Sequence, residues 1–167
     1  EFDFSLFDRY AQVFWNTGKM DYMETGFLTN RGEARWASTE IFLNDFNIMD
    51  ESTSSQVTLP GEEVIPQLLS AFENHLRKRG WLDKTYFHVM DEPSHHNAVP
   101  WKEISIYMHK YAPDLMRMDA IETYLVNPEI EVVVPKLGHF VNWYDEWKKA
   151  QREGKELWFY TVGTIQA

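Results

Sequence analysis

The feature that most constrains this chain is a short apolar run, Thr85-Tyr86-Phe87-His88-Val89-Met90, which ends abruptly at Asp91-Glu92-Pro93. A strand with one face in water would alternate apolar and polar residues, and this run is too continuous for that. It is typical of a parallel strand that is buried on both faces. The sequence therefore predicts a parallel sheet in which two carboxylates follow the end of one strand.

Further strands and helices alternate along the chain. Hydrophobic periodicity predicts helices at residues 4–18, 62–79, 101–111 and 140–152, and strands at residues 21–28, 85–90, 115–121, 130–134 and 157–162. Such alternation indicates a parallel sheet with right-handed crossovers. In the clearest helix, 62–79, apolar residues recur every four positions, Gly80 provides the stop, and Pro66 is expected in the first turn, where proline is tolerated.

Five strands in series could form a doubly wound open sheet or part of a barrel. A nucleotide-binding open sheet would carry a glycine-rich motif after its first strand, and neither GxGxxG nor GxxxxGK[ST] occurs. Charged and aromatic residues instead follow the strands, where barrel enzymes place their chemistry: Asp91-Glu92, Glu122, Lys136 and Tyr160. The predicted fold class is α/β, a partial (β/α)8 TIM barrel.

The length of 167 residues is short for such a barrel, which normally needs about 200 or more. We therefore expect a single domain, 1–167, that forms the central and C-terminal part of a larger barrel. The missing N-terminal part of the same barrel, or a second copy, would complete the sheet. Residues 30–61 are predicted to be a long loop insertion, with a hairpin between residues 41–49 and 56–59.

Composition excludes several classes of partner. Lys and Arg total 16 against 26 for Asp and Glu, so the net charge is −10, which argues against a nucleic-acid surface. No apolar run approaches 18 residues, so no membrane insertion is expected. There are no cysteines, which excludes disulfides and thiolate metal sites but leaves the compartment open. Aromatic residues are 16% of the chain, enough to build platforms for sugar rings as well as cores.

Asp91 and Glu92 are the strongest candidates for chemistry. A desolvated carboxylate beside another negative charge resists ionisation and can act as an acid near neutral pH. Adjacent carboxylates are poorly placed to flank a sugar from opposite sides, as a simple two-carboxylate glycosidase requires. They suit a mechanism in which one protonates the leaving oxygen and the other holds a substrate group that acts as the nucleophile. A structural role, in helix capping or ion pairs, is the alternative.

Several segments resemble glycoside hydrolase family 123 and the related domain-of-unknown-function 4091 proteins, and the resemblance runs from about Phe2 to the end. The segments are Tyr86 to Pro93, Trp101-Lys102-Glu103, Asp119-Ala120-Ile121-Glu122, Val134-Pro135-Lys136-Leu137 and Trp158-Phe159-Tyr160-Thr161. The resemblance implies a barrel catalytic domain preceded by a β-sandwich, and a retaining β-N-acetylgalactosaminidase or β-N-acetylhexosaminidase that acts on glycans. It implies Glu92 as general acid/base and Asp91 as the residue that orients the 2-acetamido group, whose carbonyl oxygen forms an oxazolinium. It implies no cofactor.

Other residues are candidates for contact with the glycan substrate: His88, Glu122, Trp143, Tyr144, Trp158 and Tyr160. Tyr160 is favoured because it ends a strand, and we expect it to face the same cleft as Glu92. Two other functions stay open. One is a non-catalytic carbohydrate-binding remnant of a barrel, and the other is a metal-dependent barrel hydrolase that uses Asp91, His95 and His96, although no metal site is predicted.

Overall fold

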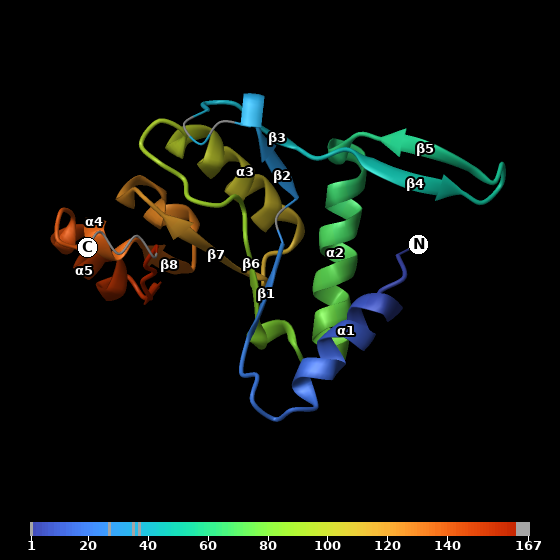
Figure 1. The fold of residues 1–167 in the computed structure, drawn as a ribbon, viewed down its shortest axis with the longest axis horizontal. Coiled ribbons are helices and arrows are strands. Elements are labelled where there is room, and N and C mark those ends of the chain that lie inside the picture. The colour runs from blue at the N-terminus through green and yellow to red at the C-terminus, as the bar shows by residue number, and fades with distance from the viewer. Residues whose placement is uncertain (1, 27, 35, 37, 163–167) are drawn as a thin grey trace.

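The computed structural model describes residues 2–26, 28–34, 36 and 38–162 (Figure 1). The main helices are α1 (Ser5–Trp15), α2 (Gly61–Arg79), α3 (Ala98–Tyr111), α4 (Leu137–Phe140) and α5 (Tyr144–Arg152). Short 3₁₀ turns are η1 (Gly32–Ala34), η2 (Leu82–Lys84) and η3 (Tyr124–Glu129). The strands are β1 (Met23–Thr25), β2 (Thr29–Arg31), β3 (Ile41–Leu43), β4 (Phe46–Asp50), β5 (Ser55–Leu59), β6 (Thr85–Phe87), β7 (Met116–Ile121), β8 (Val132–Pro135) and β9 (Glu156–Leu157).

Five strands form one sheet in the order β1-β6-β7-β8-β9. Every pair in this sheet is parallel, and each strand from β6 onward is the neighbour of the next along the chain. The predicted α/β class, with a parallel sheet and intervening helices, is confirmed. Because all strands run the same way, their carboxyl ends lie at one edge, and that edge holds the candidate site.

The two faces of this sheet have different neighbours. Phe87, Ile121 and Val133 belong to a large core that also contains buried residues of α1, α2, α3 and α5. Alternate positions point the other way and form a second cluster without a helical residue among those described: Tyr86, Met118, Val132 and Val134, with Met116, Trp158 and Tyr160 packed against them. The helices therefore cover one face of the sheet.

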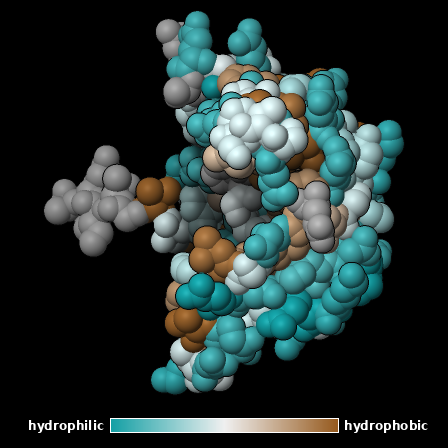
Figure 2. Space-filling model, turned by 90° about the vertical axis from the view of Figure 1, so that its right-hand side faces the viewer, coloured by the Kyte–Doolittle hydropathy of each residue, from teal (hydrophilic) through white to brown (hydrophobic). Residues whose placement is uncertain are grey.

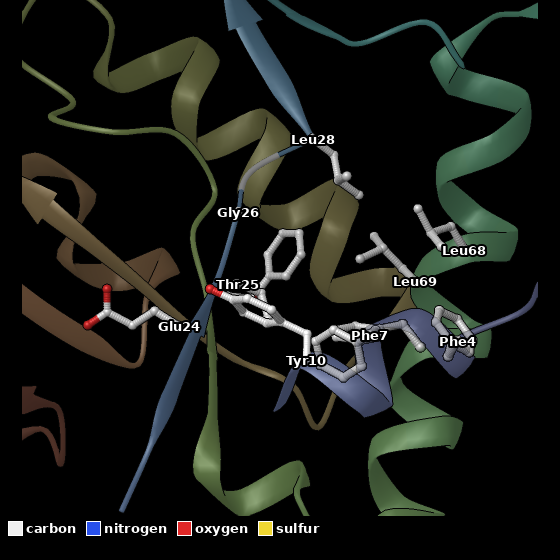
Figure 3. A pocket seen from close by; sticks show the side chains of 11 residues that line it. Phe4, Phe7, Tyr10, Glu24, Thr25, Gly26, Leu28, Leu68 and Leu69 are labelled. Carbon is white, nitrogen blue, oxygen red and sulfur yellow. The ribbon is translucent and has the colours of Figure 1, made fainter. Parts of the chain in front are cut away.

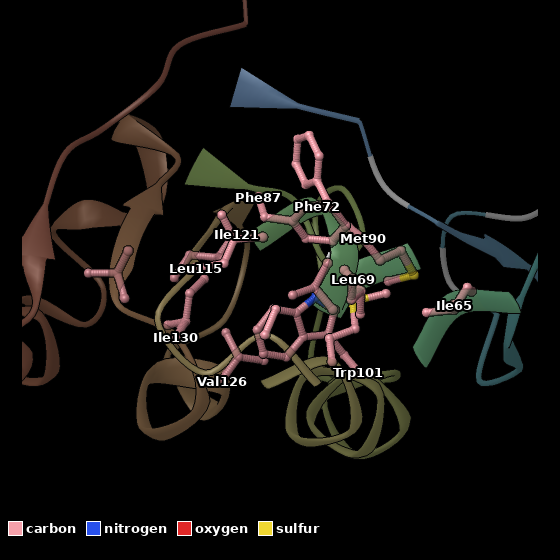
Figure 4. Packing of buried hydrophobic residues seen from close by; sticks show 14 of the residues in the cluster. Ile65, Leu69, Phe72, Phe87, Met90, Trp101, Leu115, Ile121, Val126 and Ile130 are labelled. Carbon is pink, nitrogen blue, oxygen red and sulfur yellow. Dashed lines mark hydrogen bonds between the residues drawn. The ribbon is translucent and has the colours of Figure 1, made fainter. Parts of the chain in front are cut away.

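The large core is built around Trp101 of α3, which is completely buried. Figure 4 shows its indole between α3 and the strands, with Leu69 of α2 and Met90 close by. The side chain of Arg117 on β7 is also buried and forms a two-point ion pair with Glu131, through Nη2 at 2.6 Å and Nε at 2.9 Å. Its Nη1 also donates to the carbonyl oxygen of Ser105 at 3.1 Å, so the buried guanidinium ties β7 to α3.

Helix α2 begins at Gly61, one residue earlier than predicted, so Pro66 lies beyond the first turn. Proline has no N–H to donate to the carbonyl four residues earlier, which here belongs to Glu62. The Tyr107 hydroxyl of α3 donates to that carbonyl oxygen at 3.5 Å and partly replaces the missing bond. Gly80 has a φ of 67° and ends the helix in the left-handed conformation, as predicted.

Several predicted boundaries are wrong. The strand predicted at 85–90 ends at Phe87, and the strand predicted at 157–162 is reduced to Glu156–Leu157 with a single further bridge at Tyr160. The helix predicted at 140–152 is divided into α4 and α5. A hydrophobic run indicates which residues are buried, not which residues pair in a sheet. Val89 and Met90 are buried although they follow the last paired residue of β6, so the predicted strand was too long.

Residues 30–61 are more structured than the predicted loop. The predicted strand at 21–28 is interrupted after Thr25, and the chain then forms β2, which pairs with β3 in an antiparallel sheet. Strands β4 and β5 form a second antiparallel pair, which confirms part of the predicted hairpin. Figure 1 shows this hairpin projecting beyond the end of α2, away from the parallel sheet.

The surface carries exposed apolar side chains on α1, including Leu6 and Val13. Figure 2 shows the side of the molecule that carries α1, α2 and the β4–β5 hairpin, where hydrophobic groups interrupt a mostly hydrophilic surface. No helix in the described part of the chain combines the length and the apolar character needed to cross a bilayer.

Candidate functional site

The carboxyl edge of the parallel sheet is joined by backbone hydrogen bonds that continue past the strands. The Glu122 N–H donates to the carbonyl oxygen of Pro93 at 2.9 Å, and the Lys136 N–H donates to that of Ile121 at 3.3 Å. The Leu137 N–H donates to the carbonyl oxygen of Tyr160 at 2.9 Å. These bonds hold the segments after β6, β7, β8 and β9 against one another, so side chains far apart in sequence are fixed at one edge.

Glu92 and Tyr160 meet at this edge. The Tyr160 hydroxyl donates to Oε1 of Glu92 at 2.5 Å, which confirms their predicted proximity. Burial and the Glu92 carboxylate raise the pKa of Tyr160 above its ordinary value, so the phenol stays protonated as a donor. Glu92 has a φ of 46°, in the left-handed region, and its carbonyl oxygen accepts a hydrogen bond from Nη2 of Arg31 at 3.3 Å.

Asp91 lies next to this pair and is exposed. Its pKa is raised, first by loss of hydration and then by the charge of Glu92, while Arg31 and His88 act in the opposite direction. Two adjacent carboxyls therefore have different environments, since Glu92 is half-buried and bound by a phenol.

Glu122 and Lys136 form an ion pair at the same edge, with Nζ to Oε1 at 2.9 Å. The hydrogen bond from Lys136 to Glu122 raises the pKa of Lys136, and the charges of Glu122 and Glu92 act in the same direction. Lys136 therefore remains a cation beside the carboxylates. Together with Arg31 it provides positive charge at an edge where Asp91, Glu92 and Glu122 are acidic.

His88 lies where β6 leaves the sheet. Its Nδ1 is 2.9 Å from Oδ1 of Asp119, and its Nε2 is 3.1 Å from Oε2 of Glu24. Burial lowers the pKa of His88, but the hydrogen bonds to these two carboxylates outweigh it and raise the pKa to about 9. Both ring nitrogens therefore face carboxylates of the protein.

The other aromatic candidates fall into two groups. Trp158 packs on Tyr86, with ring centroids 5.3 Å apart, on the face of the sheet without helices. Trp143 is half-buried and makes ring contacts with His95, Tyr124, His139 and Trp147. Tyr144 is 52% exposed and lies next to Phe140. Contact of these three side chains with a glycan stays a prediction.

The alternative metal site of Asp91, His95 and His96 gains no support. Within the described residues, no group of three or more His, Cys, Asp or Glu side chains is placed to hold an ion. The His95 ring packs instead against Trp143, with centroids 5.2 Å apart.

Arg31 and Asp119 were not among the predicted site residues, and Lys136 was predicted to lie at a strand end but was given no role. Arg31 falls in a segment predicted to be a loop, and no pattern in the sequence marks it. Lys136 follows a predicted strand, and that position is the signal that could have identified it. Asp119 is an acidic residue within an apolar strand, which is also an unusual position, because an unpaired buried carboxylate is costly.

A cavity of about 360 Å³ lies on the helix side of β1. Figure 3 shows Phe4, which precedes α1, and Phe7 and Tyr10 of α1 facing Leu68 and Leu69 of α2 across it, while the Glu24 carboxylate points away. Its lining is almost entirely apolar, so it lacks the hydrogen-bonding groups that orient a sugar. The polar groups of the carboxyl edge are the better candidate site.

The fold and this edge place the chain among α/β proteins whose functional groups follow the carboxyl ends of parallel strands. The family model "Glycoside hydrolase 123, catalytic domain" matches residues 1–166. The chain therefore belongs to glycoside hydrolase family 123.

A similar solved structure is a family 123 glycoside hydrolase from Clostridium perfringens, described in terms of glycolipid glycan hydrolysis. The TM-score is 0.66 and the sequence identity 20%, so the similarity concerns the fold. The match covers 100% of this chain and 31% of that one, so this chain spans about a third of its length. No curated protein sequence matches the chain significantly.

Proposed function

We propose that this chain carries the acid/base pair of a retaining glycoside hydrolase that removes a β-linked 2-acetamido sugar, N-acetylgalactosamine by family resemblance. The observation that carries the proposal is the contact of Glu92 with Tyr160, beside Asp91, at the carboxyl edge of the sheet. The glycan of a glycolipid is the favoured substrate, because the Clostridium perfringens relative is described in terms of glycolipid glycan hydrolysis.

The proposed roles divide the two carboxyls. In the first step the carbonyl oxygen of the 2-acetamido group attacks the anomeric carbon, the bond to the leaving oxygen breaks, and Glu92 gives its proton to that oxygen. Asp91 orients the acetamido group and opposes the positive charge of the oxazolinium that forms. Tyr160 holds the carboxyl of Glu92 in one position by its hydrogen bond.

The second step reverses these roles. A water molecule gives a proton to Glu92 while its oxygen attacks the anomeric carbon, and the bond from that carbon to the acetamido oxygen breaks. The acetamide is restored and the sugar leaves with its original configuration. Contiguous carboxylates suit this mechanism because the nucleophile comes from the substrate, so no second carboxylate is needed across the bond.

We also propose that the sheet is part of a (β/α)8 barrel, forming a single catalytic unit over residues 1–167. Two features support a barrel over a doubly wound sheet. The buried residues of α1 and α5 and most of those of α2 and α3 belong to the core on one face, and no described helical residue belongs to the cluster on the other, whereas a doubly wound sheet has helices on both faces. Each successive strand of the sheet is also added on the same side of the one before it, in the order β1-β6-β7-β8-β9. In a doubly wound sheet, the side on which strands are added changes once along the chain.

The test uses the full natural protein and aryl β-glycosides of N-acetylgalactosamine, N-acetylglucosamine and galactose. Wild type should cleave an acetamido sugar and not the galactoside, and a thiazoline analogue of the cyclised sugar should inhibit it. Glu92→Gln should lose about 10²- to 10⁴-fold in kcat with a poor leaving group. Its kcat/KM should fall much less with a dinitrophenyl leaving group, whose departure needs no protonation, whereas Asp91→Asn should lose activity with both leaving groups.

Three results would contradict this proposal. Equal cleavage of the galactoside would exclude substrate assistance. Loss of activity to a chelator, restored by metal, would favour a metal-dependent hydrolase. Glycan binding without turnover, unaffected by Glu92→Gln, would indicate a carbohydrate-binding protein.

A further inference from the structure

Asp119 is a buried carboxylate that the proposed reaction does not use. It lies on β7, its side chain is completely buried, and burial raises its pKa to about 6. Its Oδ2 accepts hydrogen bonds from the Met90 N–H at 3.0 Å and from the Trp101 indole at 2.9 Å. Met90 directly precedes Asp91, so Asp119 fixes the backbone from which the two proposed catalytic carboxyls extend.

His88 connects Asp119 to the first strand of the sheet. Its two ring nitrogens each face a carboxylate oxygen, from Asp119 on β7 and from Glu24 on β1. Ionised carboxylates only accept hydrogen bonds, so a ring that satisfies both must donate from both nitrogens and is an imidazolium. The geometry alone thus indicates a positive charge at His88, in agreement with its raised pKa.

The charge at His88 acts on Asp91, three residues further along the chain. Loss of hydration and the charge of Glu92 raise the pKa of the Asp91 carboxyl, while Arg31 of β2 and His88 lower it. The net pKa of Asp91 is raised, so the imidazolium, held between the carboxylates of β7 and β1, offsets part of this rise.

We propose that His88 and Asp119 are positioning residues for the catalytic pair: Asp119 fixes the peptide before Asp91, and the His88 imidazolium keeps Asp91 in its anionic form. This inference rests on the proposed function, since it assumes that an anion at position 91 opposes the oxazolinium. It differs from the sequence prediction for His88, which was direct contact with the glycan.

Asp119→Asn and His88→Gln test the pair in the full natural protein. The first variant retains an oxygen that can accept from Met90 and Trp101, and it removes one of the two carboxylates that hold the His88 ring. With His88→Gln, Asp91 loses a nearby cation and should need a higher pH to ionise, so the acidic limb of the kcat/KM profile should move up by about one pH unit. Asp119→Asn should leave that limb in place, because a ring whose pKa falls from about 9 by about one unit is still protonated there. At neutral pH kcat should fall about tenfold with KM unchanged, because the substrate contacts remain.

His75→Gln is the matched control. His75 pairs with Asp8 at 2.6 Å, between α2 and α1, and is outside the proposed site. It should lower stability without moving the pH profile. If His88→Gln also leaves the profile in place, or if either variant raises only KM, the positioning role is overturned.

An NMR titration of the His88 ring separates this inference from the proposed function. In wild type the ring should titrate near pH 9, and in Asp119→Asn its pKa should fall by about one unit or more. An unchanged titration overturns the inference whatever the activity. A wild type that shows the titration but cleaves none of the glycosides overturns the proposed function and, with it, the catalytic part of this role.

Discussion

Tyr160 and Glu92 are in hydrogen-bond contact although two strands, β7 and β8, lie between the segments that carry them. Adjacent strands are about 4.8 Å apart, so three steps on a flat sheet would separate these segments by about 14 Å. Glu92 lies in the segment after β6 and not on a strand, so this segment and the two long side chains together span the distance.

Tyr160→Phe tests the value of this contact for the proposed reaction. The variant keeps the ring and removes one hydrogen bond to a charged group, which contributes about 1.5–3 kcal/mol. We expect kcat/KM for an aryl N-acetylhexosaminide to fall about 10- to 100-fold. Tyr10→Phe, at an exposed position on α1, is the control, and equal activity of both variants would show that the Tyr160 hydroxyl has no role.

The ion pair of Glu122 and Lys136 should be measurable by a double-mutant cycle. Urea unfolding of wild type, Glu122→Gln, Lys136→Met and the double variant should give a coupling free energy of about 1 kcal/mol, lower at high salt. The pair of Arg77 and Asp114, whose side chains are 45% and 67% exposed, should couple by less than about 0.5 kcal/mol. Additive effects at Glu122 and Lys136 would show that the pair is not formed in solution.

Arg117 should contribute strongly to stability because its side chain is only 6% exposed. Arg117→Met removes the guanidinium that donates to Glu131 and to two Ser105 oxygens, although the backbone N–H of residue 117 still donates to Glu131, and we expect a loss of about 3 kcal/mol in the free energy of unfolding. Arg152→Met, on the exposed end of α5, should change it by less than about 0.5 kcal/mol. Similar urea midpoints for the two variants would be incompatible with the buried ion pair.

The same ion pair predicts a dependence of stability on pH. Burial raises the pKa of Glu131, but the hydrogen bonds from Arg117 outweigh it, and the net pKa lies below the ordinary value of 4.5. A lowered folded-state pKa stabilises the protein above the unfolded-state value, and this stabilisation is lost as the pH falls through the folded-state value. Glu131→Gln should therefore flatten the decrease in unfolding free energy below pH 4.5, and an unchanged slope would contradict the shift.

Gly61 lies where α2 meets β3, and a side chain has no room there. A Cβ at this position would be 2.6 Å from the carbonyl oxygen of Asn44 and 2.7 Å from Cβ of Leu43. Gly61→Ala should lower the free energy of unfolding by about 1–3 kcal/mol, since the backbone must shift. Gly138→Ala, where no atom lies within 4 Å, should be neutral or stabilising, and the urea midpoints of the two variants should differ accordingly.

The parallel sheet and the common edge of Glu92 and Tyr160 could be predicted from the sequence because each depends on a local signal. Apolar runs mark buried strands, and the residue after each run lies at the carboxyl edge whatever the exact register. Boundaries such as Phe87 could not be predicted, since burial continues through Met90 after the hydrogen-bonded ladder has ended.

Contacts between segments far apart in sequence were not predictable. Arg31 reaches Glu92 because the chain leaves the parallel sheet after β1 and forms β2, which pairs with β3, and no periodicity in residues 21–40 indicates that change of partner. The environment of Asp119 likewise depends on the placement of Trp101 and His88 around it. Local patterns identify which residues are candidates, and the packing of helices on strands determines which of them meet.

Glu92 has a left-handed backbone conformation, which glycine adopts more readily than any residue with a Cβ. A residue with a Cβ is less stable in that conformation by about 1–2 kcal/mol, and glycine would relieve the cost. Glu33 and Ser54 also have a positive φ, so this conformation does not by itself identify a functional position. If Glu92 is the general acid/base proposed above, its carboxylate is kept at this position for activity at a cost in stability.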